Sequence, residues 1–145
     1  KCGNIWTVSF VNFKKSNRCP NCQSKYSKAV DLIRNTLIEN EINFIQEQTF
    51  PLCKLTRCLP FDFYFPQENI LLEYDGELHD RVWQTKSKLT KDKKLAITKL
   101  RDETKEKFAL ENNFIFIRIR HDEDLPSRIQ YLLQTILEVQ RLSKS

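Results

Sequence analysis

Acidic side chains interrupt an aromatic-rich, strand-like segment at residues 59–80, LPFDFYFPQENILLEYDGELHD. Side chains alternate along a strand, so Glu73 and Asp75 are expected on one face of theirs. Asp62 is expected on the face opposite to its two phenylalanine neighbours, and pairing of the two strands could bring it beside either acid. Carboxylates a few ångströms apart in a partly dry site repel one another unless a cation lies among them or a proton is shared. The segment therefore predicts a site for a hard divalent cation.

The chemistry expected at such a site is phosphoryl chemistry with Mg²⁺ or Mn²⁺. Mg²⁺ usually binds one or two carboxylates and completes its octahedron with water and substrate phosphate. Gly76 allows a close turn after the strand, which would bring His79 to the same place as a general acid or base. Asp102 and Lys105, three residues apart on an expected helix, share a face and would add an acid and a cation that stabilises a phosphorane-like transition state.

A simpler interpretation places Glu73 and Asp75 on the solvent face of an edge strand, with His79 in a surface turn. Strand periodicity alone does not separate the two interpretations. Basic residues favour the first one, because they could follow a nucleic-acid backbone. These are Lys86, Lys88, Lys91, Lys93, Lys94, Lys99, Arg118 and Arg120.

Charge and hydropathy limit the function classes. The 145 residues include 24 Lys and Arg against 19 Asp and Glu, a net charge of +5 that favours a polyanionic partner, although a merely soluble basic surface has the same composition. No apolar run approaches the roughly 18 residues of a membrane span, and the first 15 residues do not have the pattern of a signal peptide. We therefore expect an intracellular, soluble protein without a membrane partner.

Periodicity predicts a mixed α/β (α+β) fold. A helix is expected over residues 27–40, with Ser27 as its cap, and a long helix over residues 91–112. Strands are expected at 44–50, 60–65 and 70–74 as an antiparallel meander, and a last helix begins near Pro126. The run FIFIRI at 114–119 is apolar enough for burial on both faces, which predicts a central place in the sheet. The order is a small N-terminal knuckle followed by α-β-β-β-α-β-α.

Each predicted helix has an expected inner face. These residues are Val30, Ile33, Leu37 and Ile38 in the first helix, Ile97, Leu100, Thr104 and Phe108 in the second, and Ile129, Leu132, Leu133, Ile136, Leu137 and Val139 in the last.

The five cysteines suggest a metal site more than a disulfide framework. Cys19 and Cys22, in RCPNC, have the spacing of half a zinc site, and Cys2 could be a third ligand. Cys53 and Cys58 could form a second site, but cysteines of this kind are more often small buried residues.

The motifs CPNC, LPFDFYFP, ILLEYDGELH and LRDETKEKFALENNFIFIRI occur in this order between residue 19 and about residue 121. Their combination resembles the very-short-patch-repair-like, EDxHD-type homing endonucleases of the PD-(D/E)XK nuclease superfamily. The resemblance implies a restriction-endonuclease-like sheet at residues 27–145 and a treble-clef-like zinc finger at residues 1–26. It also implies Mg²⁺-dependent hydrolysis of phosphodiester bonds in DNA and a homing or mobile-element role.

The resemblance also implies roles for single residues. Asp62 corresponds to the metal-binding acid, and it is open whether Glu73 or Asp75 is the second ligand. His79 corresponds to the histidine that activates water or aids the leaving group, while Asp102 and Lys105 match the helical Asp-x-x-Lys. Two positions depart from the family pattern: Val30 stands where relatives often have a glutamate, and Leu78 where they have a glutamine.

For the zinc finger, the resemblance implies that Cys2, Cys19 and Cys22 are joined by a cysteine expected two residues before Lys1, since Cys2, Gly3 and Trp6 match the second half of CxxCGxxW. A non-catalytic, zinc-containing nucleic-acid-binding module with a nuclease-like fold is the alternative function, and an RNA-directed nuclease is a third. The sequence leaves open whether the protein acts as a monomer or as a dimer on DNA.

Overall fold

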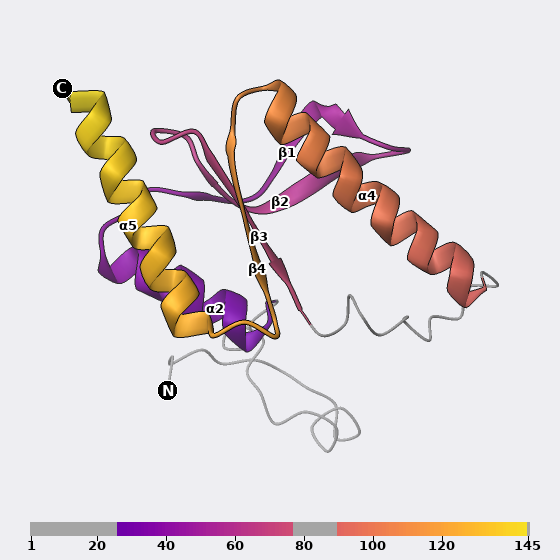
Figure 1. The fold of residues 1–145 in the computed structure, drawn as a ribbon, viewed down its shortest axis with the longest axis horizontal. Coiled ribbons are helices and arrows are strands. Elements are labelled where there is room, and N and C mark those ends of the chain that lie inside the picture. The colour runs from indigo at the N-terminus through magenta and orange to yellow at the C-terminus, as the bar shows by residue number, and fades with distance from the viewer. Residues whose placement is uncertain (1–25, 77–89, 145) are drawn as a thin grey trace, which may run out of the picture.

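The computed structural model describes residues 26–76 and 90–144, which form one mixed sheet with helices on both faces (Figure 1). The elements follow one another as α2 (Lys28–Glu39), β1 (Ile45–Lys54), β2 (Cys58–Phe65), β3 (Ile70–Asp75), α4 (Lys91–Glu111), β4 (Ile115–Arg120) and α5 (Leu125–Lys144). The predicted order α-β-β-β-α-β-α and the mixed α+β class are confirmed.

The sheet has the strand order β1-β2-β3-β4. The first three strands pair antiparallel, as the predicted meander requires, and β4 pairs parallel to β3 with Asp75 opposite Arg120. Because parallel strands point the same way, β3 and β4 end at the same edge of the sheet. The acidic end of β3 therefore lies beside the arginines of β4.

Two hydrophobic layers cover the sheet. On one face, α2 and α5 bury Ile33, Leu37, Leu132 and Ile136 against the strands. On the other face α4 packs through Phe108 and Ala109, and Figure 1 shows this helix opposite α2 and α5. The acidic residues of β3 therefore have a helix within reach on the α4 side.

The edge position of β4 corrects the prediction of a central strand. Within the described ranges β4 pairs with β3 alone, and Ile115 is 40% exposed. Ile117 and Ile119 are buried because the α2 and α5 layer covers them. Helices on both faces produce an apolar strand at an edge as well as in the centre, so composition alone could not place it.

The inner face of α4 also differs from the prediction. Phe108 is buried, but Ile97 and Leu100 are 39% and 49% exposed, and neither belongs to a core cluster of the described residues. The helix is 21 residues long, and Figure 1 shows its N-terminal half extending past the strands. Apolar spacing identifies a helix face but not how much of that face has a sheet beneath it.

The shorter helices follow the prediction more closely. In α2, Ser27 Oγ accepts from the Val30 backbone N–H at 3.3 Å, and Val30 is buried with Ile33 and Leu37 while Ile38 is 58% exposed. In α5, Ile129, Leu132 and Ile136 are buried, Leu133 and Val139 pack at the margin, and Leu137 is 51% exposed. Ile38 and Leu137, which were predicted to belong to the inner faces of these helices, are therefore exposed instead.

Strand β2 changes face at Asp62. Phe61 packs in the α4 layer and Phe63 in the α2 and α5 layer, although both are fully buried. The strand opposite is irregular at the same level, because Glu47 has φ 52 between the pairs formed by Gln46 and Gln48. A residue with left-handed backbone conformation interrupts the regular alternation of side chains between the two faces of a strand. The expectation that Phe61 and Phe63 share one face is therefore wrong.

Candidate active site

The candidate site begins where β2 and β3 separate. Their pairing ends at Phe63 and Leu72, and the next acceptor for β3 is a side chain: Asp62 Oδ2 accepts from the Tyr74 backbone N–H at 2.7 Å. The carboxylate thus takes the place that a backbone carbonyl has in a continued ladder. Asp62 is fixed beside the acidic end of β3, as the sequence predicted.

Glu73 is the buried centre of the site, since only 5% of the residue is exposed. Its Oε1 forms an ion pair and hydrogen bond with Lys105 Nζ from α4, whose side chain is 13% exposed. The same ammonium lies 5.3 Å from the centre of the Phe61 ring. The change of face at Asp62 turns Phe61 toward α4, and this places an aromatic ring beside the lysine.

The charges of Asp62 and Asp75 act on the ionisation of Glu73. Burial raises the pKa of Glu73 from 4.5 to about 7, Lys105 opposes this increase, and the negative charges of Asp62 and Asp75 add to it. A carboxyl group whose pKa is raised by burial and by two neighbouring acids is typical of functional sites. The structure therefore brings together the three residues that the sequence predicted as metal ligands.

Asp75 faces an arginine whose role the sequence did not reveal. Arg118 on β4 approaches Asp75 Oδ2 through Nε at 3.5 Å, Glu106 Oε1 through Nη1 at 3.3 Å and Asp102 Oδ1 through Nη2 at 3.9 Å. Its side chain is 24% exposed and also lies 5.4 Å from the centre of the Phe116 ring. Arg118, expected along a nucleic-acid backbone, thus connects β3 to α4.

Among the described residues, the contacts of this cluster involve more acids than bases. Two cations, Lys105 and Arg118, lie among five carboxylates, namely Asp62, Glu73, Asp75, Asp102 and Glu106. The excess contrasts with the net charge of +5 for the whole chain. A divalent cation would compensate it better than a further monovalent side chain.

The donor set suits Mg²⁺ or Mn²⁺ in kind, because carboxylate oxygens are the ligands that hard cations prefer. As the side chains stand, no three His, Cys, Asp or Glu residues of the described ranges converge closely enough to hold a metal ion. Glu73 instead directs one oxygen at Lys105. The expected general acid or base His79 and the zinc candidates Cys2, Cys19 and Cys22 lie outside the described residues.

Neither α2 nor the remaining cysteines add a ligand. Val30 is buried in the core, and Asp31 Oδ1 pairs with Arg34 at 3.3 Å. Cys53 is fully buried and burial raises the pKa of its thiol, as expected for a core residue, whereas Cys58 is exposed.

Glu106 is the acid that sequence reasoning missed. It lies four residues after Asp102, so both carboxylates project from the same side of α4 toward Arg118. That i, i+4 spacing was the available signal.

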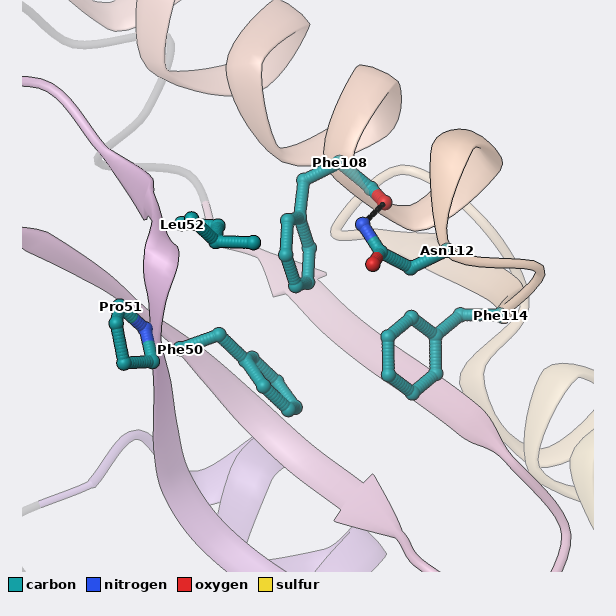
Figure 2. A pocket seen from close by; sticks show the side chains of 6 residues that line it. All are labelled: Phe50, Pro51, Leu52, Phe108, Asn112 and Phe114. Atoms are coloured by element: carbon teal, nitrogen blue, oxygen red, sulfur yellow. Dashed lines mark hydrogen bonds between the residues drawn. The ribbon is translucent and has the colours of Figure 1, made fainter.

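A separate hollow lies at the C-terminal end of α4 (Figure 2). Its volume is about 240 Å³, and it is lined by Phe50, Pro51, Leu52, Phe108, Asn112 and Phe114. Asn112 Nδ2 donates to the Phe108 carbonyl at 2.9 Å. None of the lining side chains titrates, so the hollow offers apolar contact but no acid–base chemistry.

Comparison of the chain with family models, with curated proteins and with solved structures gives no match. None of the helices in the described part of the chain has both the length and the apolar character needed to cross a membrane.

Proposed function

We propose that this chain is a Mg²⁺-dependent endodeoxyribonuclease that hydrolyses phosphodiester bonds. One observation carries the proposal: Asp62 and Asp75 lie near the buried carboxylate of Glu73, at the point where β2 and β3 separate. Strand ends that meet at one edge of a sheet are a usual place for a binding site in mixed folds.

In this function the acids would hold the cation, with Asp62 as one ligand and Glu73 or Asp75 as the second. A bound Mg²⁺ would neutralise phosphate charge and activate water. Lys105 offers a cation for the charge that develops on the phosphate, and Arg118 fixes Asp75 and Asp102 in position. We assign the proton transfer to His79.

DNA is the proposed partner because of the charge of the chain and the resemblance of its motifs. Exposed basic residues on the N-terminal half of α4, among them Lys93, Lys99 and Arg101, could contact phosphates. The homing or mobile-element role and a structural zinc held by Cys2, Cys19 and Cys22 belong to the same proposal and derive from the resemblance.

A cleavage assay tests the proposal. The wild type is incubated with supercoiled DNA in Mg²⁺ or in EDTA, beside Asp62→Asn and Glu73→Gln. We expect Mg²⁺-dependent cutting that falls by at least about 100-fold in both variants. Asp122→Asn is the matched control, because Asp122 is 57% exposed and pairs with Arg120 at 3.2 Å. Structured RNA in a parallel reaction identifies an RNA-directed enzyme.

A second candidate is a non-catalytic nucleic-acid-binding module. It is favoured by the partners that the three acids already have: the Tyr74 N–H for Asp62, Lys105 for Glu73 and Arg118 for Asp75. A structural ion-pair network has the same appearance. This candidate predicts retardation of DNA in a gel without cutting, equally in wild type and Asp62→Asn.

A further inference from the structure

Lys105 occupies the position beside Glu73 that the proposed metal ion would take. Its ammonium contacts Glu73 Oε1, the oxygen of the most buried acid in the cluster. Asp62 and Asp75 are close enough to act on the ionisation of the same carboxylate. Within this group of three acids, Lys105 is the cation at Glu73, while Asp75 pairs with Arg118.

An ammonium and a divalent cation cannot both bind the Glu73 carboxylate without a large cost in free energy. Both need the lone pairs of Glu73, and two positive centres a few ångströms apart repel each other strongly in a partly dry site. In the arrangement that includes Lys105, the described acids do not converge as metal ligands. The two cations therefore compete for the same carboxylate.

Lys105 also has an alternative acceptor. Asp102 lies three residues earlier on α4, within the range of an i, i+3 pair, and Arg118 approaches its Oδ1 only at 3.9 Å. The lysine stem is flexible, and the Phe61 ring is already beside its ammonium. A short rotation of the stem would move the ammonium from β3 to the exposed side of α4.

We propose that Lys105 is an internal counter-ion that a divalent cation exchanges for at Glu73. Without metal, the ammonium neutralises the buried carboxylate. With metal, it leaves Glu73 and becomes available to a substrate phosphate. This inference rests on the metal site of the proposed function.

The first test measures the binding of Mn²⁺ without DNA by titration calorimetry at pH 8.5. Lys105→Met keeps the length of the side chain and removes its charge, so binding no longer requires breaking a charge-assisted hydrogen bond. We expect about tenfold tighter binding of Mn²⁺ than in the wild type. The matched control is Lys107→Met, since Lys107 is 74% exposed and pairs with Glu111 instead. Unchanged or weaker binding in a folded Lys105→Met protein would overturn the exchange.

Acetylation of the wild-type protein gives a second test that needs no substitution. Lys105 is expected to react slowly without metal, and Mn²⁺ at saturating concentration should raise its labelling rate at least about tenfold, measured by mass spectrometry. Lys107 should react at the same rate in both conditions. A Lys105 rate that stays low when Mn²⁺ is bound contradicts the inference.

The two proposals fail in different ways. Mn²⁺ binding that releases Lys105 in a protein that leaves DNA intact would overturn the nuclease and keep the exchange. Mg²⁺-dependent cutting with Lys105 still protected would overturn the exchange and keep the nuclease.

Discussion

Lys105 on α4 and Glu73 on β3 form an ion pair across 32 residues of sequence, with side chains that are only 13% and 7% exposed. Each group is costly to bury alone, because a charge loses its hydration in the protein interior. The pair therefore holds α4 against the end of β3 and concentrates charge at the candidate site.

Breaking this pair from one side should destabilise the protein. Lys105→Met leaves an unpaired buried carboxylate, and we expect the free energy of unfolding to fall by about 3 kcal/mol at pH 8 in urea. The double variant Lys105→Met/Glu73→Gln should recover most of the loss because no buried charge remains. Equal losses in the single and double variants would show that the two residues act independently.

Stability should depend on pH through Glu73. Its pKa is raised from 4.5 in the unfolded chain to about 7 in the folded protein, so between these values the folded state binds more protons. The contribution of Glu73 is therefore full below pH 4.5 and is lost as the pH rises through about 7. Relative to Glu73→Gln, the wild type should lose unfolding free energy from pH 5 to pH 8. A constant difference between the two proteins would contradict the shift.

Metal binding should show the opposite dependence on pH. A proton on Glu73 competes with Mg²⁺, so affinity should fall as the pH drops below about 7, by up to about tenfold per unit. Calorimetry with Mg²⁺ at pH 6 and pH 8 measures this change. Affinity that is the same at both values would exclude Glu73 as a ligand.

Two substitutions of Asp62 separate its structural role from its chemical one. Asp62→Asn keeps an oxygen that can accept from the Tyr74 N–H, so stability should change by less than about 1 kcal/mol. Asp62→Ala removes the acceptor and should cost about 1–3 kcal/mol. Both should abolish metal binding. Retained Mg²⁺ affinity in Asp62→Asn would remove this residue from the ligand set.

Arg118 and Arg120 offer a matched comparison on β4. Arg118→Met leaves Asp75, Asp102 and Glu106 without their shared cation, and we expect a loss of about 2 kcal/mol. Arg120 is 57% exposed and pairs with Asp122, so Arg120→Met should cost less than about 0.5 kcal/mol. Equal melting temperatures for the two variants would show that Arg118 does not hold α4 to β3.

Local sequence patterns predicted the order of the elements, but they did not predict which faces of those elements are buried. Ser27 and the apolar spacing of Val30, Ile33 and Leu37 identified α2 because a cap and a buried stripe are local features. Ile97 and Leu100 were placed wrongly because the extent of the sheet under α4 is a tertiary property. The face change at Asp62 lies opposite Glu47, a left-handed residue of the neighbouring strand, and alternation along β2 alone cannot show it.

The candidate site was predictable to a similar degree. Asp62, Glu73 and Asp75 were found from their types and from strand pairing. Their partners Lys105 and Arg118 depend on where α4 and β4 pack, 30 or more residues further along the chain. Sequence spacing therefore identified the acids and placed Lys105 at the site, but it did not show that Lys105 pairs with Glu73 or that Arg118 pairs with Asp75.

Nicking of supercoiled DNA in the presence of Mg²⁺ is the most direct test of the nuclease proposal. We expect cutting by the wild type that stops in EDTA and falls at least about 100-fold in Glu73→Gln, with Asp122→Asn as active as the wild type. Intact DNA with a folded, Mg²⁺-binding wild type, or equal cutting by Glu73→Gln, would contradict it.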